Sequence, residues 1–287
     1  MIEPASHVGL QEQRHPCSPM CGGDGRRTEA AADRAFWTEF SSRYDDTVGG
    51  VESAANALAA VRRLLSSDDT LLDVGAGTGR FAIELAPHVQ AITALDHSRH
   101  MLDVLSAKAA TAGIDNITML EQECVAGSVL PVHDVVLAAW SLYRSTDMDG
   151  VLSALVRAAR CMLVIVCGVG GHPPHRALVE RHFGTWTDAT GPDHLDIARA
   201  LWEQGTLVNI TITDERYRLE ADSPVAIAEA LAPRGSEPAS VVQFAGDLTG
   251  FLEWDGNGVS YECTIQTSVL VAVPGATCVT LATCSTR

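Results

Sequence analysis

A glycine-rich turn is the stretch of this sequence whose residue types and spacing are best suited to chemistry. The apolar run Leu71–Val74 is followed by three glycines at alternate positions, Gly75, Gly77 and Gly79. A helical pattern begins directly after them, which indicates a buried strand, a tight turn and a helix. Glycines let the backbone turn sharply and let a ligand come close. The free N–H groups at a helix start favour carboxylates or phosphates, so the stretch predicts a site for a negatively charged group.

The elements that position this turn alternate between strand-like and helical patterns. The predicted strands cover residues 71–74, 91–95, 117–120, 135–140 and 162–167, and the predicted helices cover residues 81–85, 100–112 and 149–160. This alternation predicts a parallel sheet covered on both faces, with right-handed crossovers. In such sheets the ligand binds at the carboxyl ends of the strands, which is where the glycine turn is expected.

The rest of the chain is predicted to attach to this sheet within one domain, residues 28–275. Residues 1–27 hold Pro, Gly, Ser and charges without a period, which indicates a mobile extension. Two helices are predicted within residues 28–65, and a helical insert over the substrate site is predicted for residues 172–205. Further strands are expected at 207–219 and 263–273, with helix and loop at 223–252 and a C-terminal tail at 276–287.

Composition and charge exclude several classes of protein. Hydrophobic residues make up 46% of the 287 residues, which is normal for a globular chain. No apolar run approaches the roughly 20 residues of a membrane helix, and the N-terminus shows no secretion signal, so the cytoplasm is the expected compartment. The formal charge of −16, from 36 acidic and 20 basic residues, disfavours nucleic acid as a partner, because binding it usually needs a basic face. We interpret the acidity as a contribution to solubility.

The cysteines give no convincing metal site. Without a secretion signal, the eight cysteines are expected to be reduced thiols. Cys17 and Cys21 are spaced C-x3-C with His15 nearby, but a metal site needs about four ligands. An unstructured tail is the favoured interpretation of this segment, and no metal is predicted.

Two classes of cofactor site use a glycine turn after a first strand. The dinucleotide fingerprint G-x-G-x-x-G needs a third glycine that packs the helix against the strand. Arg80 occupies that position here. This mismatch disfavours a site for NAD.

The run Leu72–Gly79 closely resembles the first motif of the class I methyltransferases that depend on S-adenosylmethionine. Residues 94–102, 121–124 and 133–136 are similar to later segments of that family in order and spacing. The resemblance implies an α/β, Rossmann-like, doubly wound fold, with a seven-stranded, mostly parallel sheet, an antiparallel last strand and an N-terminal helical lid. It also implies S-adenosylmethionine as the methyl donor and S-adenosylhomocysteine as the product.

The resemblance assigns the glycine turn to the methionine end of this cofactor. Backbone groups of Gly75, Ala76, Gly77 and Gly79 would approach it closely, and the Asp73 carboxylate would pair with its ammonium group. The alternative is that Asp73 only caps a strand.

An aromatic helix near the N-terminus is similar to the lid of many small-molecule members of the family. Its Tyr44 would touch the methionine end of the cofactor. The alternative is that the aromatic stripe of Phe36, Phe40 and Tyr44 only packs on the sheet.

The ribose and the adenine are expected at the ends of the second and third strands. Asp96 lies 21 residues after Gly75, where a carboxylate accepts hydrogen bonds from both ribose hydroxyls. By the resemblance, His97 and Met101 would flank the adenine, and Glu123 with the backbone N–H of Cys124 would bind its edge. The alternatives are a capping role for Asp96 and a core position for Met101.

The acceptor is expected near the end of the fourth strand and under the insert. Trp140 and Tyr143 would wall an aromatic or apolar acceptor, and Arg144 would meet an acidic one. His172 and His175 are candidate bases near neutral pH, and Tyr143 is a third catalytic candidate. A base is needed only if the acceptor keeps its proton through the transition state. Ordinary packing or simple exposure is the alternative for each.

The resulting hypothesis is a methyltransferase acting on a small molecule, with specialised metabolism as one expected setting. The acceptor atom, O, N, C or S, stays open, and a monomer or homodimer is expected. An NAD-linked oxidoreductase, which shares the fold and the ribose carboxylate, is a competing hypothesis. A non-catalytic binding or assembly module is a second competing hypothesis, and a methyltransferase for protein or RNA is a third.

Overall fold

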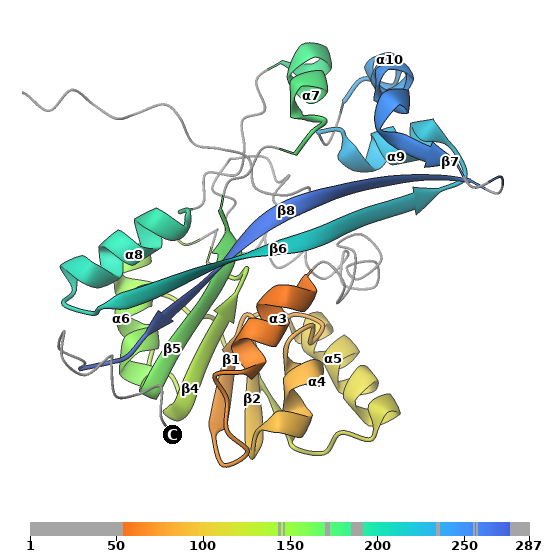
Figure 1. Ribbon diagram of the computed structural model, residues 1–287. Coiled ribbons are helices and arrows are strands. Elements are labelled where there is room, and N and C mark those ends of the chain that lie inside the picture. Colours follow the sequence, from red (N-terminus) through yellow and green to blue (C-terminus); the bar gives the residue numbers. More distant parts are fainter. Residues whose placement is uncertain are drawn as a thin grey trace, which may run out of the picture.

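The computed structural model describes residues 54–142, 145, 147–169, 173–184, 192–233, 236–254, 256 and 258–275. Five strands form the parallel part of its sheet: β1 (Thr70–Val74), β2 (Ala91–Asp96), β3 (Ile117–Glu121), β4 (His133–Ala139) and β5 (Ala159–Gly168). The strand order is β3-β2-β1-β4-β5-β8-β6, and β8 (Val259–Ala272) is antiparallel to both β5 and β6 (Val208–Ala221). A short eighth strand, β7 (Leu252–Trp254), pairs with β8. The predicted mostly parallel sheet with an antiparallel last strand is confirmed (Figure 1), but it has eight strands instead of the predicted seven, because β7 pairs with the extended β8.

Helices cover both faces of the sheet because successive residues of each buried strand point to opposite sides. Leu71 packs with α3 (Ala55–Arg62), α4 (Ala82–Leu85) and α5 (Arg99–Ala112), whereas Leu72 packs with α6 (Met148–Ala158) and α8 (His194–Glu203). A short 3-10 helix, η4 (Ala86–His88), follows α4 at Pro87. None of the helices in the described ranges is long and apolar enough to cross a membrane.

Local capping explains where the helices on the sheet begin and end. The Ser98 hydroxyl accepts a hydrogen bond from the N–H of Met101 at the start of α5, and Gly113 ends that helix in a left-handed conformation. The α8 helix begins with a reciprocal pair of hydrogen bonds between Asp193 and Asp196.

The predicted insert at 172–205 contains two helices that pack in different places. The second, α8, lies beside α6 on one face of the sheet. The first, α7 (Arg176–Phe183), joins α9 (Pro224–Leu231) and α10 (Pro238–Leu248) beyond the sheet (Figure 1). The insert is therefore not one unit.

The extra helices rest on an extension of the two longest strands. Both β6 and β8 have 14 residues, but β5 pairs only with residues 267–272 of β8. Residues 214–221 of β6 and 259–266 of β8 run on beyond the end of β5. We call these two stretches together with β7, α7, α9, α10 and η5 (Thr249–Phe251) the cap. Its own buried core includes Tyr217, Phe244 and Tyr261.

The cap lies at the end of the sheet where a ligand is expected. Because β8 is antiparallel to both of its neighbours, β6 runs in the same direction as β1–β5. The second half of β6 therefore points past the carboxyl ends of the parallel strands. The fold thus places a separately packed layer at the same end as the glycine turn.

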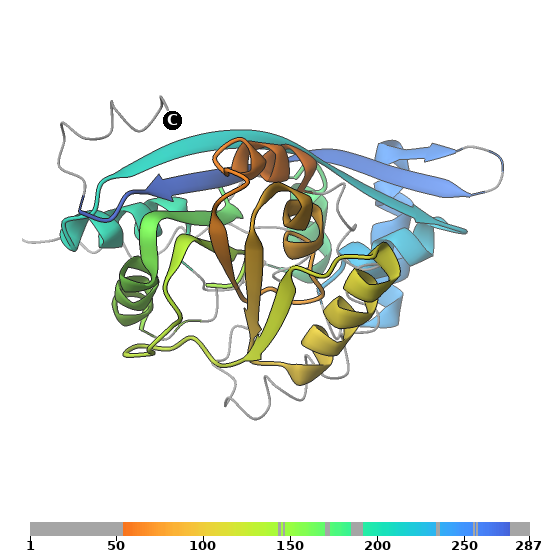
Figure 2. The same ribbon diagram turned by 90° about the horizontal axis from the view of Figure 1, so that it is seen from below.

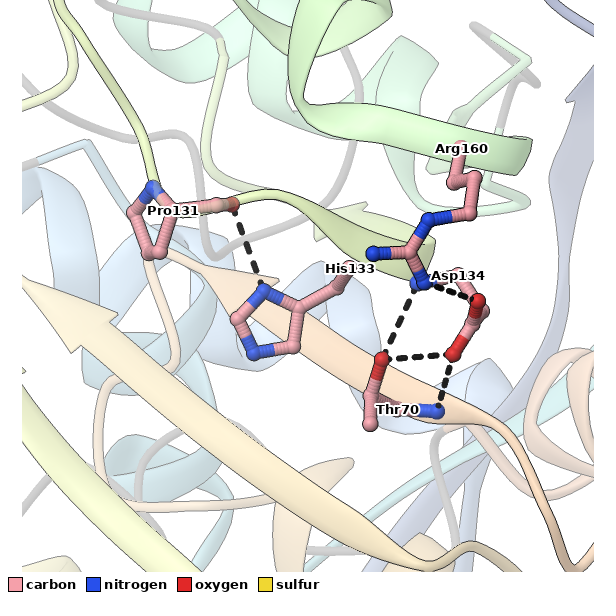
Figure 3. A network of polar contacts seen from close by, with 5 residues as sticks. All are labelled: Thr70, Pro131, His133, Asp134 and Arg160. Carbon is pink, nitrogen blue, oxygen red and sulfur yellow. Dashed lines mark hydrogen bonds and ion pairs between the residues drawn. The ribbon is translucent and has the colours of Figure 1, made fainter.

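A polar network closes the opposite, amino-terminal end of the sheet (Figure 3). The Asp134 carboxylate on β4 accepts hydrogen bonds from the Thr70 backbone N–H at 3.0 Å and the Thr70 hydroxyl at 2.7 Å, and pairs with Arg160 on β5. The hydrogen bonds from Thr70 hold the pKa of Asp134 near 2, below its usual value of 3.8. His133 joins the Pro131 carbonyl and the Thr93 hydroxyl. The start of β4 is thus a structural junction, distant from the glycine turn.

Asp134→Asn should destabilise the protein by about 1–2 kcal/mol at pH 7, because it removes a charged hydrogen-bond acceptor. The folded-state pKa is lower than the unfolded one, so this contribution is present above pH 4 and is lost as the pH falls toward 2. Urea unfolding of the wild type and of Asp134→Asn at pH 7 and pH 3 measures the difference in their free energies of unfolding. Glu229→Gln on α9 is the control. If the two proteins differed in free energy of unfolding by the same amount at both pH values, the lowered pKa of Asp134 would be contradicted.

Candidate active site

The glycine turn connects β1 to α4 across the end of β2. The N–H groups of Gly75 and Ala76 both donate to the Leu95 carbonyl, at 2.7 and 3.0 Å. Gly75, Gly77 and Gly79 have φ values of 75°, 56° and 90°, in the left-handed region that favours glycine. The predicted tight turn is therefore present, and hydrogen bonds hold it against the carboxyl end of β2.

The three glycines serve different purposes. A Cβ at Gly75 would lie 2.3 Å from the Ser141 Cβ, and one at Gly79 would lie 2.8 Å from the Leu105 Cγ. These two glycines are required by packing against the loop after β4 and against α5. A Cβ at Gly77 would meet nothing within 4 Å among the described residues. Gly77 is thus the position where a ligand could approach the backbone.

Asp96 ties the glycine turn to the start of α5. Its carboxylate is 6% exposed, and it accepts hydrogen bonds from the N–H of Gly77 at 2.9 Å and of Ser98 at 2.8 Å. His97 Nδ1 lies 3.3 Å from the same carboxylate. The carboxylate is therefore fixed in position, and its Oδ2, which accepts only from Gly77, keeps a further lone pair for another donor.

Asp73 brings a second carboxyl group to this edge. It is 2% exposed, and burial together with the neighbouring Asp96 charge raises its pKa from 3.8 to about 7. Its Oδ2 has no hydrogen-bond partner within the part of the chain that the structure describes. A buried carboxyl with an open acceptor atom is suited to a cationic group.

Trp140 lies across from the turn, at the end of β4. Its φ of 48° places a non-glycine residue in the left-handed region, which marks a constrained backbone. Its indole lies 5.9 Å from the Phe81 ring, and the Arg80 guanidinium lies 5.6 Å from the indole centre. Arg80, where the dinucleotide fingerprint has glycine, therefore helps to build an aromatic wall beside the turn.

The predicted adenine side shows a mixed arrangement. Met101 is 3% exposed in the first turn of α5, as its alternative core position predicts. Glu123 is exposed and Cys124 is half-buried in the loop after β3, and burial raises the pKa of the Cys124 thiol to about 11. The N–H of Gln122 donates to the Asp96 carbonyl at 3.0 Å, which holds this loop beside Asp96.

The structure does not bring His175 together with the glycine turn. His175 is 1% exposed at the start of α7, and a 2.5 Å hydrogen bond joins its Nδ1 to the hydroxyl of Tyr261 on β8. Tyr261 is six residues along β8 from Thr267, which pairs with the end of β5. Six strand residues span roughly 20 Å, so Tyr261 and the His175 bonded to it lie about that far along β8 from the end of β5. Burial lowers the pKa of His175 to about 4, so its ring is neutral at pH 7.

Several predicted site residues lie outside the described residues. They are Tyr44, Tyr143, Arg144 and His172. Within the described part, no three His, Cys, Asp or Glu side chains gather in a way that could hold a metal ion.

Sequence reasoning misses two contributors to the site. Ser141, which follows Trp140 directly, forms the contact that requires Gly75, and no motif marks it. Arg80 stands out in the sequence only as a mismatch to one motif, whereas in the structure it lies over the Trp140 indole. The signal available for Ser141 is its position directly after Trp140, which ends a predicted strand, and the signal for Arg80 is its position directly after the glycine turn.

Comparison with known proteins identifies the domain that carries this turn. Residues 71–161 match a family model described as a methyltransferase domain. Residues 71–161 therefore form a methyltransferase domain, in agreement with the predicted resemblance to the class I, S-adenosylmethionine-dependent family. The predicted cofactor, S-adenosylmethionine, agrees with this domain.

Relatives of this methyltransferase domain are distant in sequence. An uncharacterised protein of Haemophilus influenzae is 25% identical over 190 residues, which are 62% of this chain and 66%, just under two thirds, of that protein. YcgJ of Bacillus subtilis has a TM-score of 0.54 and 13% identity, covering 78% of this chain and all of its own. A candidate methyltransferase of Bacillus halodurans has a TM-score of 0.54 and 14% identity, covering 76% and 99%. At these identities the two solved structures support the fold alone.

Gly77→Ala should weaken cofactor binding by roughly tenfold or more, because the added methyl group occupies the open side of the turn. The left-handed backbone adds a strain of about 1–2 kcal/mol. Gly113→Ala is a matched control for this strain, since Gly113 has φ 68° with no contact within 4 Å and ends α5. Calorimetric titration with S-adenosylhomocysteine compares them. Equal affinities for the two variants would show that Gly77 does not face the cofactor.

Proposed function

We propose that this methyltransferase domain transfers a methyl group to a small-molecule acceptor held beside Trp140, between the glycine turn and the cap. The observation that carries the proposal is the buried Asp73 carboxyl, whose open Oδ2 lies at the same strand edge as Gly77 and Asp96. The carboxylates and the open turn fit a ligand that has both an ammonium group and ribose hydroxyls. When bound, S-adenosylmethionine supplies an electrophilic methyl group on a cationic sulfur.

The described residues act by binding and orienting. Asp73 pairs with the ammonium group, and Asp96 accepts hydrogen bonds from the ribose hydroxyls while it holds the N–H of Gly77. The backbone from Gly75 to Gly79, including Ala76, borders the methionine end, with Gly77 closest to it. Positioning of this kind supplies most of what an in-line displacement needs.

The adenine pocket belongs to the same proposal. His97 and Met101 border the adenine, Met101 through a polarizable thioether that also packs in the core. Glu123 and the backbone N–H of Cys124 bind the adenine edge, since the loop after β3 is hydrogen-bonded beside Asp96. The lid role of Tyr44 stays a prediction.

Acceptor recognition is proposed for the wall at the end of β4. The constrained Trp140, packed against Phe81 and Arg80, offers a rigid aromatic surface that excludes water. We assign His175 to the packing of the cap rather than to proton transfer, because Tyr261 occupies its Nδ1 and burial keeps the ring neutral. Tyr143, Arg144 and His172 remain predicted acceptor-side residues.

The small-molecule acceptor is supported by the net charge of −16, which disfavours nucleic acid. The cap supports it as well, because it adds a packed layer at the carboxyl end of the sheet. Specialised metabolism is the proposed setting.

Isotope-labelled S-adenosylmethionine tests the proposal. A cleared lysate of the source cells would be divided into small-molecule, protein and RNA fractions and incubated with the enzyme. Labelled methyl groups are expected in the small-molecule fraction, and the Asp96→Ala variant should show none. Labelling confined to protein or RNA would overturn the small-molecule assignment while leaving the methyltransferase activity intact.

A further inference from the structure

The strand β6 forms one edge of the sheet along its whole length. It pairs with β8 from Val208 to Ala221, and no other described strand pairs with it. Figure 2 shows it along the outer border of the sheet. An edge strand presents unpaired N–H and C=O groups that can pair with another chain, so natural edges are usually short, charged or covered.

The two halves of β6 differ in this protection. Residues 214–221 carry five charged side chains, and α3 covers the start of this half, where Asn56 Nδ2 donates to the Asp214 carbonyl at 2.6 Å. The preceding stretch, Val208–Thr213, has the sequence Val-Asn-Ile-Thr-Ile-Thr, without charge or proline. Apart from Asn209, its residues are all β-branched and have high strand propensity. We call Val208–Thr213 the open edge.

The hydrogen bonds around Asp214 establish which residues of the open edge face outward. The Asp214 carbonyl accepts a hydrogen bond from Asn56, so it points away from β8. The residue opposite Asp214 on β8 is Gln266, whose carbonyl accepts from the N–H of Val169 after β5 and so points away from β6. Backbone groups alternate direction along a strand. Val208, Ile210 and Ile212 therefore point their N–H and C=O groups away from β8.

The open edge is held rigidly in the body of the domain. The side chains of Val208 and Ile210 pack against the core between the sheet and α8. Ile212 lies two residues further along, and 43% of it is exposed. An edge that is already extended and fixed needs little ordering to accept another strand.

A second copy of the chain is the partner that fits this edge. Antiparallel pairing about a two-fold axis through Ile210 places Ile210 opposite the same residue, and Val208 opposite Ile212. Each of these pairs has its N–H and C=O groups directed outward, so each pair exchanges two hydrogen bonds. The contact is isologous and closes after two copies.

The charges along β6 favour the pairing centred on Ile210 over other registers. Each chain carries a net charge of −16, so two copies repel, and the repulsion is smallest where the contacting surfaces are themselves uncharged. Pairing centred on Ile210 uses residues 208–212 and leaves Asp214 and Glu215 outside the contact. Pairing centred further along β6 would place acidic residues of the two copies near one another.

We propose that two copies of this chain form a homodimer through antiparallel pairing of the open edges, Val208–Thr213, into one continuous sheet. The paired half of β6 is the half farther from the cap. The candidate active site at the carboxyl ends of the strands therefore stays accessible in the dimer.

Sedimentation velocity of the full chain tests the proposal. The wild-type protein is expected at twice its 30.4 kDa mass. Ile212→Lys, which adds a charge at the exposed position, and Ile212→Pro, which removes an outward N–H, should both give monomers. Both variants should keep wild-type affinity for S-adenosylhomocysteine, which shows that they are folded. Val242→Lys replaces a 57% exposed residue on α10 and should remain a dimer.

Two results would overturn the proposal. The first is a monomeric wild-type protein; if this monomer dimerised after removal of residues 276–287, the chain would cover its own edge. The second is a dimer that persists in both folded Ile212 variants.

Discussion

Asp96→Ala should abolish measurable binding of S-adenosylhomocysteine, with an affinity at least roughly 100-fold below that of the wild type. The change removes the proposed acceptor for the ribose hydroxyls, and it removes the carboxylate that fixes Gly77 and Ser98. Hydrogen bonds to a charged group contribute about 1.5–3 kcal/mol each. The loss of two corresponds to the stated factor or more.

Isothermal titration of folded protein measures this loss. Asp103→Ala is the matched control, because Asp103 lies on the exposed side of α5 and pairs with Arg99 on the same helix. Circular dichroism establishes that both variants are folded. An Asp96→Ala affinity within threefold of the control would remove Asp96 from the cofactor site.

Asp73→Asn should change cofactor affinity and protein stability in opposite directions. In the cofactor-free protein the pKa of Asp73 is about 7, above its unfolded value of 3.8. The folded state therefore loses stability as the pH rises from about 4 to 7, and this loss persists above pH 7. Asparagine cannot ionise, so the variant should be more stable than the wild type at pH 8 by up to a few kcal/mol. Near pH 4 the two proteins should be alike.

Cofactor binding should show the opposite effect. Pairing with an ammonium group favours the Asp73 carboxylate, so binding releases a proton below pH 7. Wild-type affinity should then fall up to about tenfold per pH unit between pH 7 and pH 6. The Asp73→Asn variant should bind more weakly at pH 8 and lose this pH dependence.

Titration at several pH values, together with thermal unfolding of cofactor-free protein, checks both effects. Asp134→Asn, at the other end of the sheet, should leave the binding profile unchanged. A wild-type affinity that stays constant from pH 6 to pH 8 would contradict the pairing of Asp73 with a cation.

The parallel half of the fold could be predicted from sequence because its strands are short, continuous apolar runs. Strands β1, β2 and β4 and the second half of β5 are buried on both faces, so each predicted run matches this part of an observed strand closely. The start of β5 at Ala159, where Arg160 and Cys161 are exposed, is instead predicted as the end of a helix. Asp96 could be placed because it directly ends one of these runs. The local sequence pattern was sufficient to predict a strand wherever both faces of that strand are buried.

Strands at 207–219 and 263–273 and helix at 223–252 could be predicted, but their assembly into the cap could not, because it depends on pairing between distant residues. β8 begins at Val259, four residues before the predicted start, where Glu262 and Thr264 alternate with buried neighbours. The predicted helical insert divides because α8 packs on α6 while α7 packs on α10. His175 is placed by Tyr261, which is 86 residues away in sequence.

The roles of the glycines also depend on contacts that no local pattern contains. Gly75 is required by Ser141 after β4, and Gly79 by Leu105 on α5. Sequence spacing indicates that all three glycines serve the ligand, whereas the structure leaves Gly77 alone of the three with open space around a Cβ.

The central claim is that the glycine turn, Asp73 and Asp96 together bind S-adenosylmethionine. Calorimetric titration of the wild-type chain at pH 8 with S-adenosylmethionine, and separately with NADH, tests it most directly. One S-adenosylmethionine should bind per chain in the micromolar range, and NADH should give no signal. A folded protein that gives no heat with high micromolar S-adenosylmethionine, or that binds NADH instead, would contradict the claim.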